Sequence, residues 1–344
     1  MHRHPIGPTR DAARAGFRAD LPRWRQLVTP AWLASLIAGA APAAAPAGEW
    51  RLLEAGFGAL AQYQGGHIAG AAYVDTTQIE GGVLWNKLDD AVLLQLLLAH
   101  GIACDVTVVL YGRNNLAAAR LAHVLLYAGV ADVRLLDGGL AGWRGAGLPL
   151  TQASPAPARP AASFGAPFPG RPDYLFDMAR ARAMLAQPDG VLVSTRTWNE
   201  FVGKYSGYPY IAARGDIAGA RWGRAGAGDD INSMSAFHDD AGRMRPAAQI
   251  RRMWQAAGID AQQHAVFYCG TGWRASLAFF YAWLMGWERI AVFDGGWCEW
   301  SRDGANPVRC RIDEDAARAS ACASDQRSPF DGAQGNCMVS PPVI

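Results

Sequence analysis

Short apolar runs alternate with longer helical patterns along most of the chain. Thr107–Leu110, Val133–Leu136 and Gly190–Val193 are too short for helices and rich in branched aliphatic residues, so they predict strands. Leu116–Tyr127 and Ala247–Ala257 predict helices. Short apolar strands between helices are typical of a mostly parallel sheet covered on both faces. We therefore expect an α/β fold that binds its ligand in the crevice at the carboxyl ends of the strands.

The same pattern occurs twice along the chain. An Asp-Gly-Gly turn follows a short predicted strand at Asp137 and again at Asp294, and a tryptophan follows each aspartate six positions later. Cys269 precedes Asp294 by 25 positions, and Gly112 precedes Asp137 by the same 25 positions. A repeat of this length is too long for a solenoid unit, so it predicts two tandem domains.

Composition shifts give the boundaries of these domains. Residues 1–27 form an Arg- and Pro-rich arm, and 28–150 form the first domain. A linker rich in Pro and Ala covers 151–173, because this composition favours extended stretches. The second domain covers 174–308, and the patternless segment 309–344 is expected to be a tail.

The run that begins at Cys269 carries the candidate chemistry. It follows the apolar run Ala265–Tyr268 and precedes the apolar helical run Leu277–Leu284. A glycine-spaced loop between a strand and a helix directs successive backbone N–H groups at one point, and the helix N-terminus adds its positive end. A thiol held there is favoured as a thiolate, which predicts nucleophilic cysteine chemistry on an anionic substrate. The alternative is that Cys269 is a buried structural thiol.

Composition excludes several other classes of protein. The 344 residues are 51% hydrophobic and carry a formal net charge of +2, which argues against nucleic acid as a partner. No uninterrupted apolar run reaches membrane-spanning length, so no membrane partner is expected. The six cysteines show neither a disulfide framework nor metal-ligand spacing, so we expect no metal and no other cofactor.

Three sets of residues resemble signatures of the rhodanese family of sulfurtransferases. The loop Cys269–Ser276 resembles the active-site loop, and Asp294–Trp297 resembles the late aspartate–diglycine–tryptophan signature. Gly66–Ala71 and Gly215–Ala220 resemble two copies of the early glycine–histidine–isoleucine signature. The resemblance covers roughly residues 28 to 308 and implies two tandem rhodanese-like domains. Gly112 stands where a nucleophile is needed, so we expect the first domain to be catalytically inactive.

The resemblance implies a thiosulfate sulfurtransferase, with 3-mercaptopyruvate as a second possible donor. Cys269 would take the sulfane sulfur from a small anionic donor and pass it to cyanide or a thiol, including a protein thiol. Arg274 would stabilise the thiolate and attract the donor, and Thr271 would donate a hydrogen bond or relay a proton. The substrate-binding residues expected from the loop and the preceding region are Gly270, Thr271, Gly272, Trp273, Arg274 and Arg196.

Four residues depart from the family pattern. Ser194 stands where an aspartate is usual, and Asp216 replaces the histidine of the early signature. Glu200 falls where a substrate-binding arginine is expected, so it either opposes an anionic donor or lies on a solvated turn. The bulky Trp273 narrows the pocket. These changes should preserve a small anion site while altering its selectivity.

Two other functions remain open at this stage. A rhodanese-fold phosphatase needs a longer loop than the four residues, 270 to 273, that separate Cys269 from Arg274. The absence of the expected substrate-binding arginine would fit a non-catalytic persulfide carrier or regulatory module. The chain is expected to be cytoplasmic, or periplasmic if residues 1–47 act as a secretory signal. We favour Trp32–Gly39 as the first helix of the first domain, because Met178–Ala186 occupies the same place before the second.

Overall fold

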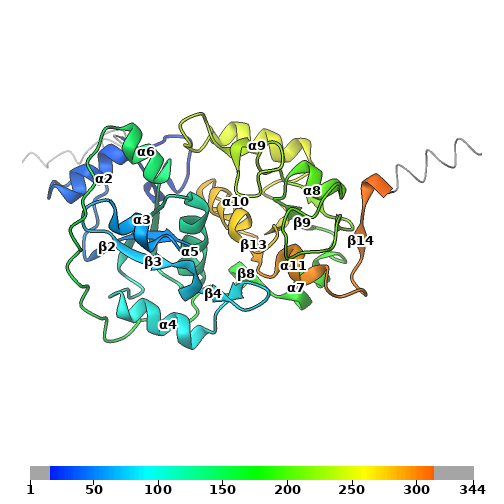
Figure 1. Ribbon diagram of the computed structural model, residues 1–344, viewed down its shortest axis with the longest axis horizontal. Helices are drawn as coiled ribbons and strands as arrows, with labels where there is room; N and C mark the ends of the chain where they lie inside the picture. The colour runs from blue at the N-terminus through cyan, green and yellow to red at the C-terminus, as the bar shows by residue number, and fades with distance from the viewer. Residues whose placement is uncertain (1–15, 314–344) are drawn as a thin grey trace, which may run out of the picture.

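Two α/β domains lie side by side in the computed structural model, which describes residues 16–313 (Figure 1). The elements of the first domain are β1 (Leu27–Val28), α2 (Pro30–Ile37), β2 (Trp50–Gly56), α3 (Leu60–Gln64), β3 (Ala72–Asp75), β4 (Glu80–Gly81), β5 (Asn86–Lys87), α4 (Asp90–Ala99), β6 (Thr107–Gly112), α5 (Asn115–Ala128), β7 (Asp132–Leu136) and α6 (Gly139–Gly145).

The second domain repeats this order with one strand fewer between α8 and α9 and with an added strand, β14, at its end. Its elements are β8 (Leu175–Phe176), α7 (Met178–Met184), β9 (Gly190–Ser194), α8 (Trp198–Val202), β10 (Asp216–Ile217), β11 (Arg221–Trp222), α9 (Ala247–Ala256), β12 (His264–Tyr268), α10 (Trp273–Leu284), β13 (Ile290–Phe293), α11 (Gly296–Trp300) and β14 (Val308–Arg309). Short 3₁₀ helices cover Trp24–Gln26, Thr76–Gln78, Pro172–Tyr174 and Ser235–Phe237.

Both main sheets have the same topology. The strand order is β1-β7-β6-β2-β3 in the first sheet, and the second sheet has the equivalent order β8-β13-β12-β9-β11. All pairs within these two sheets are parallel. The predicted fold class and the duplication deduced from spacing are therefore confirmed. Gly112 ends β6, and Cys269 directly follows the equivalent strand β12.

Side chains along the central strands alternate between two apolar clusters. Val108 and Leu110 enter a large cluster shared by both domains, whereas Val109 and Tyr111 enter an outer cluster of the first domain. In β12, Phe267 faces the shared cluster, and so does Cys269 just beyond it. This period of two places Cys269 on the face of its sheet that meets the other domain.

Helices α5 and α10 form the centre of the contact between the domains (Figure 1). Each follows the central strand of its own sheet, and almost all its side chains are buried. The apolar run after Cys269 is therefore interdomain core. It was predicted as a helix, and the structure shows why it lacks a polar face: it contacts its own sheet on one side and α5 on the other.

Three segments outside the expected domain bounds are packed against the domains. Leu21 and Trp24 of the predicted arm are buried, and the linker buries Phe164. At the other end, Val308–Arg309 pairs with Asp216–Ile217, so the second domain extends past residue 308 into the expected tail.

The helix α2 lies where the sequence favoured a domain helix. Its side chains Trp32 and Leu33 are buried in the outer cluster of the first domain. Within residues 16–313, no helix combines the length and apolar character needed to cross a membrane.

Candidate active site

Cys269 lies at the carboxyl end of β12, where its sulfur is enclosed by the following loop. The side chain is 1% exposed, and its Sγ accepts a hydrogen bond from the Gly272 N–H at 3.2 Å. Gly272 has a φ of 105° and begins α10, which a residue with a side chain would resist. The loop thus points at least one backbone donor at the sulfur, as the sequence predicted.

The carbonyl groups of the loop are held from the opposite side by α11. The Trp297 N–H donates to the Cys269 carbonyl at 2.8 Å, and the Cys298 N–H donates to the Gly270 carbonyl at 3.0 Å. Since C=O and N–H point in opposite directions across a trans peptide, these bonds turn the N–H groups of Gly270 and Thr271 away from α11. The diglycine signature therefore orients the peptide planes of the active-site loop.

Tyr208 lies against the loop at Gly270. A Cβ at Gly270 would overlap the Tyr208 ring, so this position requires glycine. The Tyr208 hydroxyl accepts a hydrogen bond from Arg274 Nη2 at 2.9 Å. Burial is the main cause of the raised pKa of Tyr208, so its hydroxyl stays protonated.

Arg274 is held in a buried bidentate pair with Glu200. Its Nη1 and Nη2 atoms donate to the two Glu200 carboxylate oxygens at 2.8 and 3.0 Å. Burial opposes the charge on Glu200, but the charge and hydrogen bonds of Arg274, together with the charge of Arg196 and the Thr197 N–H, lower the Glu200 pKa to about 2. Both expectations for Glu200 were wrong: it neither faces the cavity nor lies on a solvated turn, because it is fully buried in the capping box of α8.

Arg196 lies outside the cavity wall. It is fully buried and donates to the carbonyl groups of Gly215 and Ser206 at 2.6 and 2.9 Å. Its guanidinium also lies 3.2 Å from an Asp216 oxygen and over the ring of Trp297. Its Nε lies 3.4 Å from the Glu200 oxygen that also pairs with Arg274, so Arg196 is close to Arg274 but does not line the cavity with Thr271 and Trp273. Its assignment to substrate binding stays a prediction.

The two departures at Ser194 and Asp216 compensate for each other. Ser194 Oγ donates to Asp216 at 2.8 Å, and the Tyr268 hydroxyl donates to the other Asp216 oxygen. In the first domain the equivalent positions hold Glu54 and His67. The second domain thus keeps one buried carboxylate, but it stands on the segment of the early signature instead of on the strand, where it binds residues at the ends of β9 and β12.

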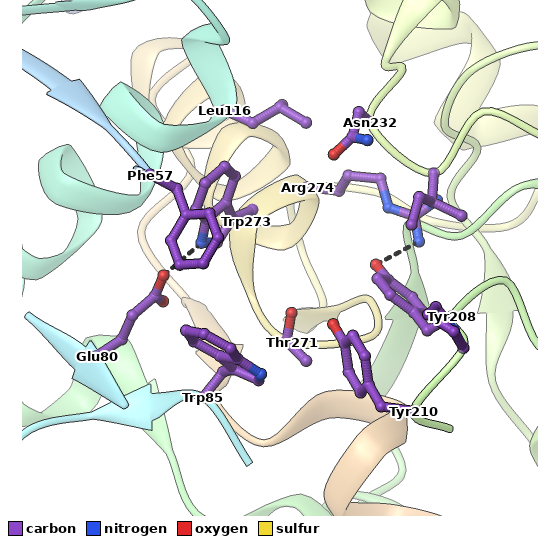
Figure 2. Close-up of a pocket in the computed structure, with 12 residues that line it drawn as sticks. Phe57, Glu80, Trp85, Leu116, Tyr208, Tyr210, Asn232, Thr271, Trp273 and Arg274 are labelled. Atoms are coloured by element: carbon purple, nitrogen blue, oxygen red, sulfur yellow. Dashed lines mark hydrogen bonds between the residues drawn. The ribbon is translucent and has the colours of Figure 1, made fainter. Parts of the chain in front are cut away.

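A cavity of about 220 Å³ opens beside the loop, and five of its twelve lining residues are aromatic (Figure 2). Thr271, Trp273 and Arg274 were predicted from the sequence and line it. The first domain contributes a second part of the wall, and an irregular segment after α8 and a later loop contribute the rest. The lining residues that sequence reasoning missed are Phe57, Glu80, Trp85, Leu116, Tyr208, Pro209, Tyr210, Ile231 and Asn232.

The charged groups of the cavity wall are paired. Glu80 accepts a hydrogen bond from Trp273 Nε1 at 2.6 Å (Figure 2). It accepts another from Arg120 Nε at 2.9 Å. Arg274 is paired with Glu200. The wall therefore combines aromatic surface with balanced charge, whereas the sequence had predicted a cationic anion site.

The first copy of the loop differs from the Cys269 loop in geometry as well as in sequence. A Cβ at Gly112 would lie 2.5 Å from the Asn114 carbonyl oxygen and 3.0 Å from that of Ala55. The backbone around Gly112 therefore leaves no room for a side chain.

Comparison with known proteins identifies the class to which this fold and loop belong. The model of the rhodanese-like domain matches residues 48–146 and 177–303. The chain belongs to the rhodanese family and carries two copies of its domain. In the described residues, no group of three or more His, Cys, Asp or Glu side chains is placed to hold a metal ion.

One protein is similar to this chain both in sequence and in structure. The thiosulfate sulfurtransferase YnjE of Escherichia coli K12 is 50% identical over 84% of this chain, which spans 66% of the length of YnjE. The crystal structure of YnjE matches with a TM-score of 0.81 and covers 84% of this chain and 69% of that one.

Two further structures are similar over the same extent. The anaerobic ergothioneine biosynthesis enzyme of Chlorobium limicola, in complex with its natural substrate trimethyl histidine, is 37% identical, with a TM-score of 0.80 and coverage of 84% and 71%. EanB with a cysteine persulfide and ergothioneine is 36% identical, with a TM-score of 0.80 and coverage of 84% and 71%.

Proposed function

We propose that the protein is a sulfurtransferase that carries sulfane sulfur as a persulfide on Cys269. The observation that carries the proposal is the position of Cys269 between a parallel strand and a helix, with the Gly272 N–H donating to its sulfur. A loop of this kind stabilises negative charge on sulfur without a cofactor. The identity to YnjE supports thiosulfate as a donor.

The reaction divides into two displacements at one sulfur atom. The Cys269 thiolate attacks the outer sulfur of thiosulfate, the S–S bond breaks, and sulfite leaves with the bonding electrons. The new persulfide carries its negative charge on the outer sulfur. Cyanide or a thiolate then attacks that sulfur, and the Cys269 thiolate leaves. This order predicts ping-pong kinetics.

The test is persulfide formation on the purified protein. Thiosulfate should add one sulfur atom to the Cys269 peptide, seen by mass spectrometry, and cyanide should remove it as thiocyanate. Cys269→Ser should abolish both steps, whereas Cys298→Ser should not, because Cys298 lies in α11. Sulfur loaded on another cysteine would rule out the assignment. Loading without turnover would favour a carrier over an enzyme.

The cavity favours a second acceptor class besides cyanide and thiols. Its wall carries Phe57, Trp85, Tyr208, Tyr210 and Trp273, and its charges are paired. Aromatic faces attract flat rings and cationic ammonium groups. A cavity of about 150 Å³ holds benzene, so 220 Å³ admits a substituted ring. The related enzyme bound to trimethyl histidine supports this class, and we propose a cationic heteroaromatic acceptor.

Such a transfer balances without an external oxidant. The ring carbon bonds to the outer sulfur of the persulfide, the S–S bond breaks, and the ring proton ends on the Cys269 thiol. The persulfide-loaded protein should therefore be offered trimethyl histidine and, separately, cyanide. Mass spectrometry of the products decides between them: a thiolated ring supports this acceptor class, and thiocyanate alone excludes it.

A further inference from the structure

Arg120 carries a buried positive charge from the silent domain to the active-site loop. It lies on α5 and is 0% exposed. Its Nε donates to Glu80 of the same domain at 2.9 Å, and its Nη2 donates to Asp294 of the catalytic domain at 2.6 Å. Asp294 is the aspartate of the diglycine signature that precedes α11.

The third nitrogen of this guanidinium has no hydrogen-bond partner. Arg120 Nη1 is buried and unpaired. A Cβ built on Gly272 would lie 3.1 Å from Nη1 and 3.3 Å from the guanidinium carbon. The free face of Arg120 is therefore in contact with the glycine whose N–H donates to the Cys269 sulfur. A buried donor without a partner costs free energy, so hydrogen bonding alone does not explain the position of Arg120 Nη1.

We propose that Arg120 is a positioning residue for sulfur transfer, supplied by the catalytically silent domain and acting through Gly272. The inference rests on the proposed function of Cys269. The guanidinium packs beneath Gly272 and keeps its N–H directed at the sulfur. It also places a positive charge behind that peptide, where negative charge gathers once the persulfide forms.

A second contact holds the same turn from the same domain. The Glu80 carboxylate that pairs with Arg120 also accepts the Trp273 Nε1 hydrogen bond at 2.6 Å. Arg120 and Glu80 thus hold both Gly272 and the residue after it. Because the loop must place its donors to within a fraction of an ångström, losing this support should slow the chemical step more than it weakens donor binding.

The test compares Arg120→Lys and Arg120→Met with Arg134→Met as a matched control. Arg134 is also a buried arginine of the first domain, 3% exposed and paired with Asp132. For Arg120→Lys we expect kcat with thiosulfate and cyanide to fall by about tenfold or more while KM changes by less than about twofold, because a loop donor is misplaced rather than deleted. Arg134→Met should keep the wild-type kcat.

Hydrogen–deuterium exchange gives a readout that does not depend on activity. Backbone amides in the peptide covering 270–274 should exchange faster in both Arg120 variants, while peptides from β9 keep their protection. If Arg120→Met fails to fold, Arg120→Lys alone decides. Unchanged loop exchange and unchanged kcat in a folded Arg120→Lys protein would overturn the proposal. A wild-type protein that transfers no sulfur would instead refute the proposed function, and the exchange result would still report on the loop.

Discussion

Arg274 shows how one side chain can differ from the role that its motif suggests. The sequence places it four residues past the loop's first glycine, where a cation would attract an anionic donor. In the structure, both of its terminal nitrogens donate to Glu200, a residue 74 positions earlier, and its side chain is 1% exposed. The positive charge of Arg274 is thus largely neutralised by the buried Glu200 carboxylate, so Arg274 attracts an anionic donor more weakly.

Arg274→Ala is therefore expected to cost stability as well as activity. Removing one partner of a buried ion pair typically costs about 3–5 kcal/mol, because the other charge is left without compensation. A full charge-assisted contact with the donor is worth about 1.5–3 kcal/mol, or roughly one to two decades in kcat/KM, and we expect a smaller fall because Glu200 already pairs with Arg274. Urea denaturation and steady-state kinetics with thiosulfate measure the two effects. Arg274→Lys should recover only part of either.

A double variant separates the two effects. In Arg274→Met/Glu200→Gln, no unpaired charge is left between these positions, so the loss of stability should be smaller than in Arg274→Ala. Wild-type kcat/KM in a stable double variant would show that the backbone amides carry the donor alone. Glu200→Arg, in contrast, would bring a third guanidinium beside Arg196 and Arg274, and we expect it not to fold.

Much of the loop could be predicted because its signals are local. The strand, the glycines and the helix after Cys269 are adjacent in sequence, and their backbone requirements do not depend on distant partners. The pair Arg274–Glu200 joins residues far apart in sequence, and Tyr208 and Tyr210 lie in a segment without periodicity, so no local pattern places them in the wall. Phe57 and Leu116 follow β2 and β6, and the rule for strand ends could have found them.

At the scale of elements, the two diglycine turns make reciprocal contacts between the domains. Asp294 accepts a hydrogen bond from the Lys87 N–H of the first domain at 2.7 Å. Asp137 accepts one from the Met244 N–H of the second domain at 2.8 Å. The signature that the sequence used to detect the repeat is thus also part of the domain contact.

Asp137 makes this contact sensitive to pH. Burial raises its pKa to about 6, although the Met244 N–H and the charges of Arg18 and Arg243 act in the opposite direction. The folded state favours the protonated Asp137 carboxyl. The stability gained from this protonation is therefore complete below the ordinary Asp pKa of 3.8 and is lost as pH rises through about 6.

Asp137→Asn should flatten that part of the pH profile. An amide keeps an oxygen that can accept from Met244 and does not ionise, so the variant should lose less stability than the wild type between pH 4 and pH 7. Thermal unfolding at several pH values measures the difference. Equal slopes in the two proteins would show that Asp137 titrates normally.

Loop geometry also decides whether the silent copy can be activated. Gly112→Cys places a side chain within 3.0 Å of two backbone carbonyl oxygens, and oxygen acceptors repel the thiolate that catalysis needs. In a Cys269→Ser background we expect no sulfur transfer and no persulfide on the introduced thiol. Restored turnover in that background would contradict this expectation.

For the whole molecule, the second domain shares both its core and the cavity beside the Cys269 loop with the first domain. Helix α10 is buried against α5, and Phe57, Glu80, Trp85 and Leu116 supply part of the cavity wall. The duplication was predictable from spacing, but the cavity shared by the two copies was not, because no periodic pattern records which faces meet.

Residues 174–308 expressed alone should therefore be poorly soluble and inactive. Loss of α5 would expose apolar side chains of α10 such as Phe279, whose ring contacts His123 of α5, and exposed patches of this kind promote aggregation. Solubility and thiosulfate turnover of the isolated domain test this. A soluble isolated domain with full activity would show that the first domain is dispensable.

The order in which the chain is synthesised gives the packed N-terminal segment another consequence. Arg18 donates to the Met244 and Arg245 carbonyl groups, and Arg23 donates to the Trp283 carbonyl, 260 positions later. A ribosome adding about 5–20 residues per second makes Trp283 roughly 13–52 s after Arg23. This segment is therefore made before both domains, but it packs against α10 only after Trp283 of the second domain has been synthesised.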